Sequence, residues 1–278
     1  LKTFSVTFQD GEYDESNFQQ DVIDLLQTEH RSVRCSYQDI CDAFPRVVWH
    51  AETPLLRTGP APLFLLSDLV NRDGYKVVLT GEGADEFFGG YDIFKEAKIR
   101  RFWAVNPGSH WRPMLLKRLY PYLKNIQAQS NAYLSAFFHV KPEDLASAFF
   151  SHLPRWELTA KLKGFLSDGV KSDIRKSDGY AEMRQRLPAA YARWDGFSQA
   201  QYLEATGLLP GYLLSSQGDR MGMAHSVEGR FPFLDHRVVD FTTKIPPRLK
   251  MKVLNEKYIL KHAAGHLVPL SVRKRPKQ

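Results

Sequence analysis

The fold of this chain is indicated most clearly by the stretch Lys76-Val77-Val78-Leu79-Thr80-Gly81-Glu82-Gly83-Ala84-Asp85-Glu86. Its first half, Lys76 to Thr80, is a short apolar run between Gly74 and Gly81, which is typical of a parallel strand buried on both faces. Its second half is rich in glycine and carboxylates. Ligands of open α/β sheets bind beyond the carboxyl ends of the strands, so this second half is predicted to lie at a ligand site.

The residues before this stretch predict strands that alternate with helices. Thr3–Phe8 and Ser32–Cys35 are rich in β-branched and aromatic residues and are predicted strands. Apolar residues at helical spacing predict three helices, which start near Ser16, at Ser36 and at Pro60. This alternation predicts an α/β layer with a parallel sheet and right-handed crossovers.

The remainder of the chain is predicted to be mainly helical within one domain over residues 1–278. We expect an α/β sheet part over residues 1–94 and a helical part over residues 95–201, which is rich in aromatic and basic residues and interrupted by prolines. A helical C-terminal part over residues 202–278 carries a second ordered segment, Asp219–Asp235, an amphipathic helix around Lys257 to Ala264, and a basic tail.

The glycine-rich acidic segment has a chemistry of its own. Gly81 and Gly83 allow the backbone to approach a ligand closely, and backbone N–H groups at a strand-to-helix turn can hold phosphate oxygens. Glu82, Asp85 and Glu86 offer hard oxygen ligands, which suit Mg²⁺ bound together with substrate phosphates. The alternative is a tight turn with helix-capping acids, and the chemistry alone leaves both open.

Composition indicates an ordinary globular protein. Of the residues, 43% are hydrophobic and 25% charged, and no apolar stretch approaches the roughly 20 residues that a membrane span needs. Cys35 and Cys41 have no partners at metal-ligand spacing, so we expect reduced thiols and a cytoplasmic location. The net charge of +7 is spread along the chain except at Arg273-Lys274-Arg275-Pro276-Lys277, which would ordinarily be a solvated tail.

At the motif level the chain resembles the asparagine synthetases, members of the N-type ATP pyrophosphatases. The string from Val77 to Tyr91 resembles the signature of that family, Asp219–Asp235 is similar to its other long motif, and Lys274–Gln278 is similar to its basic C-terminal motif. Leu1–Phe8 resembles the second strand of its sheet. The resemblance implies an adenine-nucleotide α-hydrolase-like fold with a parallel sheet and a large helical portion.

What the resemblance implies for function is an ATP-dependent ligase that needs Mg²⁺. In the family reaction the β-carboxylate of aspartate attacks ATP to give β-aspartyl-AMP and pyrophosphate. Ammonia released from glutamine in a glutaminase domain then yields asparagine. The implied partners are aspartate, ATP and that glutaminase domain, with a homodimer in the full-length protein and no nucleic-acid or membrane partner.

The resemblance also assigns roles to residues that bind the nucleotide. Val6 would line the adenine pocket through its backbone, and Thr80 and Gly81 would contact the nucleotide near the ribose and α-phosphate, with Gly83 beside them. Asp85 would ligate Mg²⁺.

Further roles concern the chemical steps. By the same resemblance Glu82 would serve the aspartyl-AMP and ammonia steps, Lys277 would stabilise charge on the phosphates or the adenylate, and Arg275 would contact the nucleotide. In the second motif, His225 is expected to be a structural hydrogen-bonding residue. Glu228 and Arg230 are expected to form a buried ion pair or to touch substrate.

Two family features are not found in this sequence. The pyrophosphate-binding Ser-Gly-Gly-x-Asp-Ser string and the glutaminase domain would both precede Leu1. We therefore expect a fragment, a gapped record of a longer chain or a degenerate homologue, and we expect these residues alone not to make asparagine.

Other functions remain open at this point. The β-lactam-forming and peptide-cyclising synthetases share the adenylation step. By the same resemblance, the β-lactam formers have Tyr at the position of Glu82, so Glu82 favours the asparagine branch. A non-catalytic nucleotide-binding or interaction module is the alternative from another class. RNA modification is a third alternative, because a net charge of +7 would favour binding to RNA phosphates.

Overall fold

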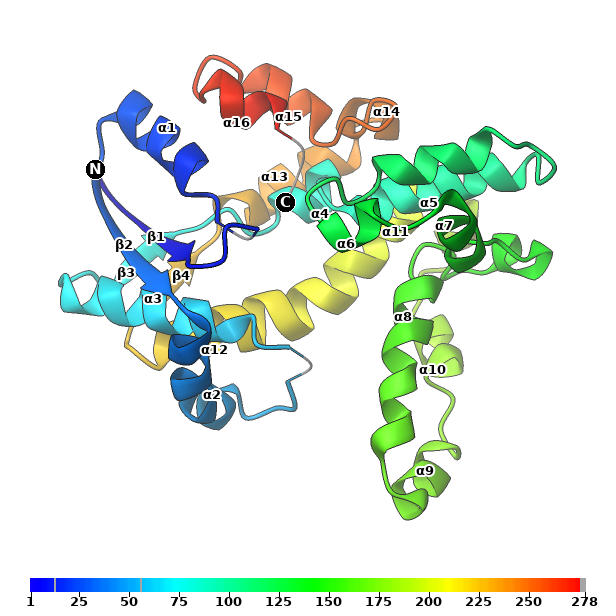
Figure 1. The fold of residues 1–278 in the computed structure, drawn as a ribbon, viewed down its shortest axis with the longest axis horizontal. Helices are drawn as coiled ribbons and strands as arrows, with labels where there is room; N and C mark the ends of the chain where they lie inside the picture. The colour runs from blue at the N-terminus through cyan, green and yellow to red at the C-terminus, as the bar shows by residue number, and fades with distance from the viewer. Residues whose placement is uncertain (13, 56, 276–278) are drawn as a thin grey trace. The chain divides into compact units, whose positions relative to one another are not determined.

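The computed structural model describes residues 1–12, 14–55 and 57–275. The chain divides into two compact units, which are described separately. Unit 1 is formed by Leu1–Tyr91 together with the chain from Glu204 onward, and unit 2 is formed by Asp92–Leu203. The ribbon in Figure 1 follows both along the chain.

The N-terminal half of unit 1 contains the strands and helices expected from its sequence pattern. Strands β1 (Lys2–Phe8) and β2 (Glu29–Cys35) pair in parallel, with Val6 opposite Val33, and α1 (Ser16–Leu26) connects them. Helices α2 (Tyr37–Ala51) and α3 (Pro60–Arg72) follow. The predicted α/β class with parallel strands is confirmed, and the sheets are small.

The core of unit 1 lies between α2, α3 and a short helix far along the chain, α12 (Arg220–Met223). Its buried residues are Ala43, Val47, Ala51, Ala61, Phe64 and Met221. The N-terminal half of unit 1 is therefore anchored to the second motif by packing.

A second sheet joins the two motifs. It consists of β3 (Val77–Leu79) and β4 (Glu228–Arg230), which pair in parallel. The prediction that β3 is buried on both faces is wrong, because Val77 is 42% exposed and Leu79 73% exposed. Among the described strands only β4 pairs with β3, and the face that these two side chains share is partly exposed.

The other elements of unit 1 are helical. Residues of the signature form α4 (Ala84–Phe88), and a π-helix (Glu204–Asp219) leads into α12. After β4 come, in order, a 3₁₀ turn (Pro232–Leu234), α13 (His236–Thr243), α14 (Pro247–Lys250), α15 (Tyr258–Ala263) and α16 (Leu270–Lys274). The predicted amphipathic helix is α15.

In unit 2 the described segments are helices and turns. The longer ones are α5 (Asp92–Ala104), α7 (Asn131–Phe137), α8 (Leu153–Ala160), α9 (Asp168–Ile174), α10 (Gly179–Gln185) and α11 (Gly196–Leu203), with α6 (Lys124–Gln127) and short 3₁₀ helices between them. None of the described helices is long and apolar enough to cross a membrane.

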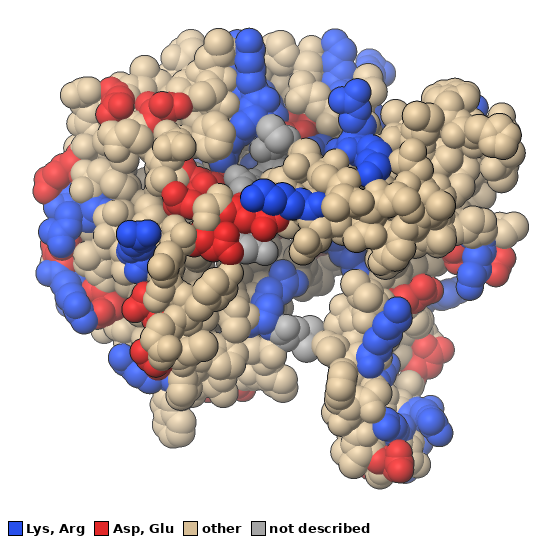
Figure 2. All heavy atoms as spheres, in the orientation of Figure 1, with Lys and Arg blue, Asp and Glu red and all other residues tan. Residues whose placement is uncertain are grey.

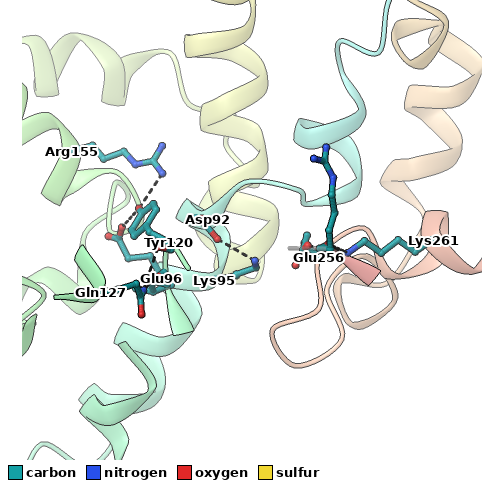
Figure 3. Close-up of polar contacts among 10 residues, drawn as sticks. Asp92, Lys95, Glu96, Tyr120, Gln127, Arg155, Glu256 and Lys261 are labelled. Carbon is teal, nitrogen blue, oxygen red and sulfur yellow. Dashed lines mark hydrogen bonds and ion pairs between the residues drawn. The ribbon is translucent and has the colours of Figure 1, made fainter. Parts of the chain in front are cut away.

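Helix α5 buries charged side chains, which Figure 3 shows. Lys95 Nζ lies 3.1 Å from Asp92 Oδ1, and the Tyr120 hydroxyl donates to Glu96 over 3.0 Å. Burial raises the pKa of Glu96, although Arg155 and Arg100 oppose this rise. Because buried charges are costly unless they are paired, these contacts hold α5 in one position within unit 2.

Candidate functional site

The two motifs meet at the carboxyl ends of β3 and β4. Val78 lies opposite Gly229, and the Thr80 N–H donates to the Arg230 carbonyl over 3.0 Å. Because the strands are parallel, the segments that follow them leave the sheet at the same edge. We call Thr80–Glu86 the acidic loop, and it begins at this edge as predicted.

Gly83 fits the acidic loop against the second motif. Its φ is +93°, and a Cβ at this position would lie 2.3 Å from Leu234 Cδ2. Next to this contact the rings of Phe88 and Phe233 meet edge to face with centroids 5.9 Å apart. The loop conformation therefore depends on a glycine at residue 83 and on close packing of the 3₁₀ turn after β4.

Asp85 lies on the first turn of α4, beside a lysine that sequence reasoning missed. Lys257 Nζ lies 2.9 Å from Asp85 Oδ1, and both side chains are mostly buried. Gly90 allows this approach, since a Cβ there would lie 1.8 Å from Asp85 Oδ1. No local pattern pointed to Lys257, because its partner is distant in the sequence.

Glu86, the last residue of the acidic loop, is buried and hydrogen-bonded. It is 1% exposed and accepts a hydrogen bond of 2.8 Å from the Tyr91 hydroxyl. Burial raises the pKa of Glu86, and the charges of Asp85 and Glu82 add to the rise. Burial likewise raises the pKa of Tyr91. Of the three acids, Glu82 and Asp85 are partly accessible, and Glu86 is the buried one.

Two observations test whether a nucleotide with Mg²⁺ fits this loop. The Thr80 hydroxyl oxygen is buried and has no hydrogen-bond partner among the described residues, and a Cβ on Gly81 would meet nothing within 4 Å. The described residues contain no group of three His, Cys, Asp or Glu side chains that could hold a metal. A metal at Asp85 would therefore take its other ligands from phosphate and water, as Mg²⁺ commonly does.

For two of the remaining predicted site residues, Val6 and Arg275, the structure shows contacts with α1 and the residue before it. Val6 is in β1, and its carbonyl accepts a hydrogen bond of 3.0 Å from the Gln19 side chain. The Arg275 guanidinium binds Glu15 over 2.9 and 3.2 Å and stacks over the Phe18 ring, so these contacts place it at the start of α1. Lys277 lies outside the described residues.

Two interpretations of the second motif have different outcomes. His225 is structural, as expected, since its Nδ1 lies 2.8 Å from the buried hydroxyl of Ser67 and its ring packs on Phe64. Glu228 and Arg230 form an ion pair of 2.9 Å, but their side chains are 58% and 62% exposed. The predicted burial of this pair is wrong because β4 is short and both side chains lie on its open face.

The two cysteines are free thiols, as expected. Cys35 is buried at the end of β2, and burial raises its pKa to about 11, whereas Cys41 is exposed.

These features define an α/β protein in which two distant motifs meet at the strand ends and form a candidate site for a small ligand. The chain belongs to the asparagine synthase family, whose sequence profile matches residues 1–278.

Curated relatives align along most of the chain. Amidase chry2 of Gibberella zeae is 27% identical over 295 residues, covering 96% of this chain and 41% of that protein. Asparagine synthetase (glutamine-hydrolyzing) 1 of Bacillus subtilis is 28% identical over 283 residues, covering 100% of this chain and 42% of that protein. Asparagine synthetase (glutamine-hydrolyzing) 3 of Arabidopsis thaliana is 41% identical over 83 residues, 29% of this chain. The chain thus spans about two fifths of the length of the first two relatives.

Proposed function

We propose that this chain supplies the acidic-loop side of an ATP-dependent amide-forming site, on an ATP pyrophosphatase fold. The observation that carries the proposal is the acidic loop itself. It leaves the carboxyl end of β3, packs through Gly83 against the second motif, and presents Asp85 beside the Lys257 ammonium. Family membership adds support, because the family profile covers the whole chain.

In this proposal the substrates are aspartate and ATP. A β-carboxylate oxygen attacks the α-phosphorus, pyrophosphate leaves, and β-aspartyl-AMP forms. Ammonia then attacks the acyl carbon, AMP leaves and asparagine forms, while Glu82 accepts the proton that ammonia loses. Thr80 and Gly81 hold the nucleotide near the ribose and α-phosphate. In the same proposal, other contacts with the nucleotide come from Val6, Gly83, Arg275 and Lys277.

Positive charge beside Asp85 would suit this chemistry. Mg²⁺ held by Asp85 would offset the negative charge of the phosphates. The Lys257 ammonium, 2.9 Å from Asp85, keeps that carboxylate in place and adds a positive charge next to the loop.

The wider setting is also proposed. Ammonia would come from glutamine in a glutaminase domain of the full-length protein, which would work as a homodimer in the cytoplasm. A second candidate is amide formation on a different acid, favoured by the similarity to amidase chry2.

The test is exchange of labelled pyrophosphate into ATP by the full-length protein. We expect exchange that requires aspartate, with Asp85→Asn lowering its rate about 100-fold because charge stabilisation at the phosphates is lost. Glu82→Gln should lower asparagine formation about 100-fold through the lost proton acceptor. Asp240→Asn, on the exposed side of α13, should match the wild type.

The outcomes separate the candidates. Exchange supported by another carboxylic acid but not by aspartate would favour the second candidate. An absence of exchange with every acid in a broad panel would refute an adenylating ligase.

A further inference from the structure

Unit 2 contains a cavity of about 600 Å³, and all of its lining residues belong to that unit. Its walls come from the end of α5, the 3₁₀ turn around Leu145, the end of α10 and the start of α11. Small-molecule sites are typically about 300–1,000 Å³ in size, so the cavity has room for a compact ligand.

Two arginines line this cavity, and Arg101 is the better placed. Its Nε is buried without a hydrogen-bond partner among the described residues, and its guanidinium packs on the Phe150 ring 4.3 Å from the centroid. Burial lowers the pKa of Arg101 more than the nearby Tyr191 and Asp195 raise it. Arg184 adds a second, exposed guanidinium at the cavity.

Asp195, the carboxylate whose charge acts on the pKa of Arg101, already accepts hydrogen bonds from its own segment. Asp195 accepts hydrogen bonds from the N–H groups of Phe197 and Ser198 and from the Ser198 hydroxyl. With these hydrogen bonds the Asp195 carboxylate caps the start of α11. Within the described part of the chain, no carboxylate lies within ion-pair distance of Arg101. A partly buried guanidinium with a buried, unpartnered Nε is stabilised most by an anion that accepts its N–H groups.

The cavity wall is rigid and partly apolar. The Tyr191 hydroxyl donates to the Ala148 carbonyl over 2.7 Å, and the Gln199 amide donates to the Tyr191 carbonyl over 3.0 Å. Tyr191 also belongs to a buried cluster with Phe149 and Leu203. Trp194 lies at the cavity as well, so an apolar ligand body has an aromatic surface to pack on.

Gly196 makes room for the arginine. A Cβ at this position would lie 2.6 Å from Arg101 Nε. A side chain at the start of α11 would therefore collide with the Arg101 guanidinium in its present position at the cavity.

From these observations we infer that the cavity binds a small anion with an apolar body, a carboxylate or a phosphate monoester, through Arg101 and Arg184. The anionic group lies on the two guanidiniums and the apolar body packs on Trp194.

The experiment titrates the full-length protein with benzoate, phenyl phosphate and the neutral benzyl alcohol, and follows tryptophan fluorescence and calorimetry. We expect saturable one-to-one binding of at least one anion and none of the alcohol. Binding of benzoate alone assigns a carboxylate ligand, and binding of phenyl phosphate alone assigns a phosphate. The fluorescence change should disappear in Trp194→Phe while the calorimetric signal remains.

Variants locate the binding. Arg101→Met should weaken it about 10-fold or more, because a hydrogen bond to a charged group is lost. Arg184→Glu should weaken it through charge reversal, whereas Arg186→Glu, an exposed change just beyond the end of α10, should not. If Arg101→Met fails to fold, the anion affinity of Arg184→Glu tests the proposal. Failure of both anions to bind, or wild-type affinity in both pocket variants, would overturn the proposal.

Discussion

At residue 83 the backbone has φ +93°, and the packing of Leu234 leaves no room for a side chain. We therefore predict that Gly83→Ala lowers the free energy of unfolding by about 1–3 kcal/mol, through backbone strain and overpacking together. Urea unfolding followed by circular dichroism measures the change.

Gly81→Ala is the matched control in the same loop. A Cβ on Gly81 would meet nothing within 4 Å, so its effect on stability should stay below about 1 kcal/mol. Adding Leu234→Ala to Gly83→Ala should relieve the steric part of the penalty. Equal stability of the two glycine variants would contradict the packing described here.

Among the candidate site residues, those in the acidic loop are the easiest to propose from the sequence. The chain from Thr80 to Asp85 is continuous, so its glycines and acids already lie close together in the sequence. Lys257 could not be found this way, because only the folded chain brings it to Asp85. The engagement of Arg275 by Glu15 is equally non-local.

At the scale of elements, α2 shows why the N-terminal helices could be predicted. Ser36 accepts a hydrogen bond from the Asp39 N–H, and the Asp39 side chain accepts one from the Ser36 N–H. We predict that Ser36→Ala costs about 1 kcal/mol of stability in thermal or urea unfolding. Ser172→Ala, at an exposed position inside α9, should cost nothing, since alanine is the better helix former. Equal effects of the two changes would show that the cap does not contribute.

Strand β4 marks the limit of such local reasoning. Its sequence, Glu-Gly-Arg, has no strand propensity, and it forms a strand because β3 offers hydrogen-bonding groups from far along the chain. The π-helix over Glu204–Asp219 contains Pro210 and was likewise not predicted. For β3 the error concerned burial, since an apolar run does not reveal how many neighbours a strand has.

At the scale of the whole molecule, the net charge of +7 is not gathered on the face shown in Figure 2, where Lys and Arg are interspersed with Asp and Glu. Such mixing is typical of a solvated surface. Two partly buried histidines make stability depend on pH.

Burial lowers the pKa of both His225 and His30. Their unfolded forms therefore bind protons at a higher pH than their folded forms, so stability falls as pH drops below the ordinary histidine pKa of about 6.5. We predict a lower free energy of unfolding at about pH 5.5 than at about pH 7.5. In His225→Gln the slope of stability against pH should be smaller, even though the Ser67 hydrogen bond is altered.

His266→Gln, at an exposed position after α15, should keep the wild-type slope. The slope rather than the stability itself is the measurement, because a structural loss alone would shift the curve without flattening it. An unchanged slope in His225→Gln would contradict the role assigned to burial.

The pairing of β3 with β4 also governs the order in which the chain can mature on the ribosome. Residues 77–79 are synthesised long before residues 228–230, with all of unit 2 between them. Throughout that interval the edge of β3 that pairs with β4 in the described structure lacks this partner, while the Val77 and Leu79 side chains lie on an exposed face of the strand. The acidic loop is therefore among the last parts of the nascent chain to acquire its shape, and its strand is the segment that a chaperone would most usefully shield.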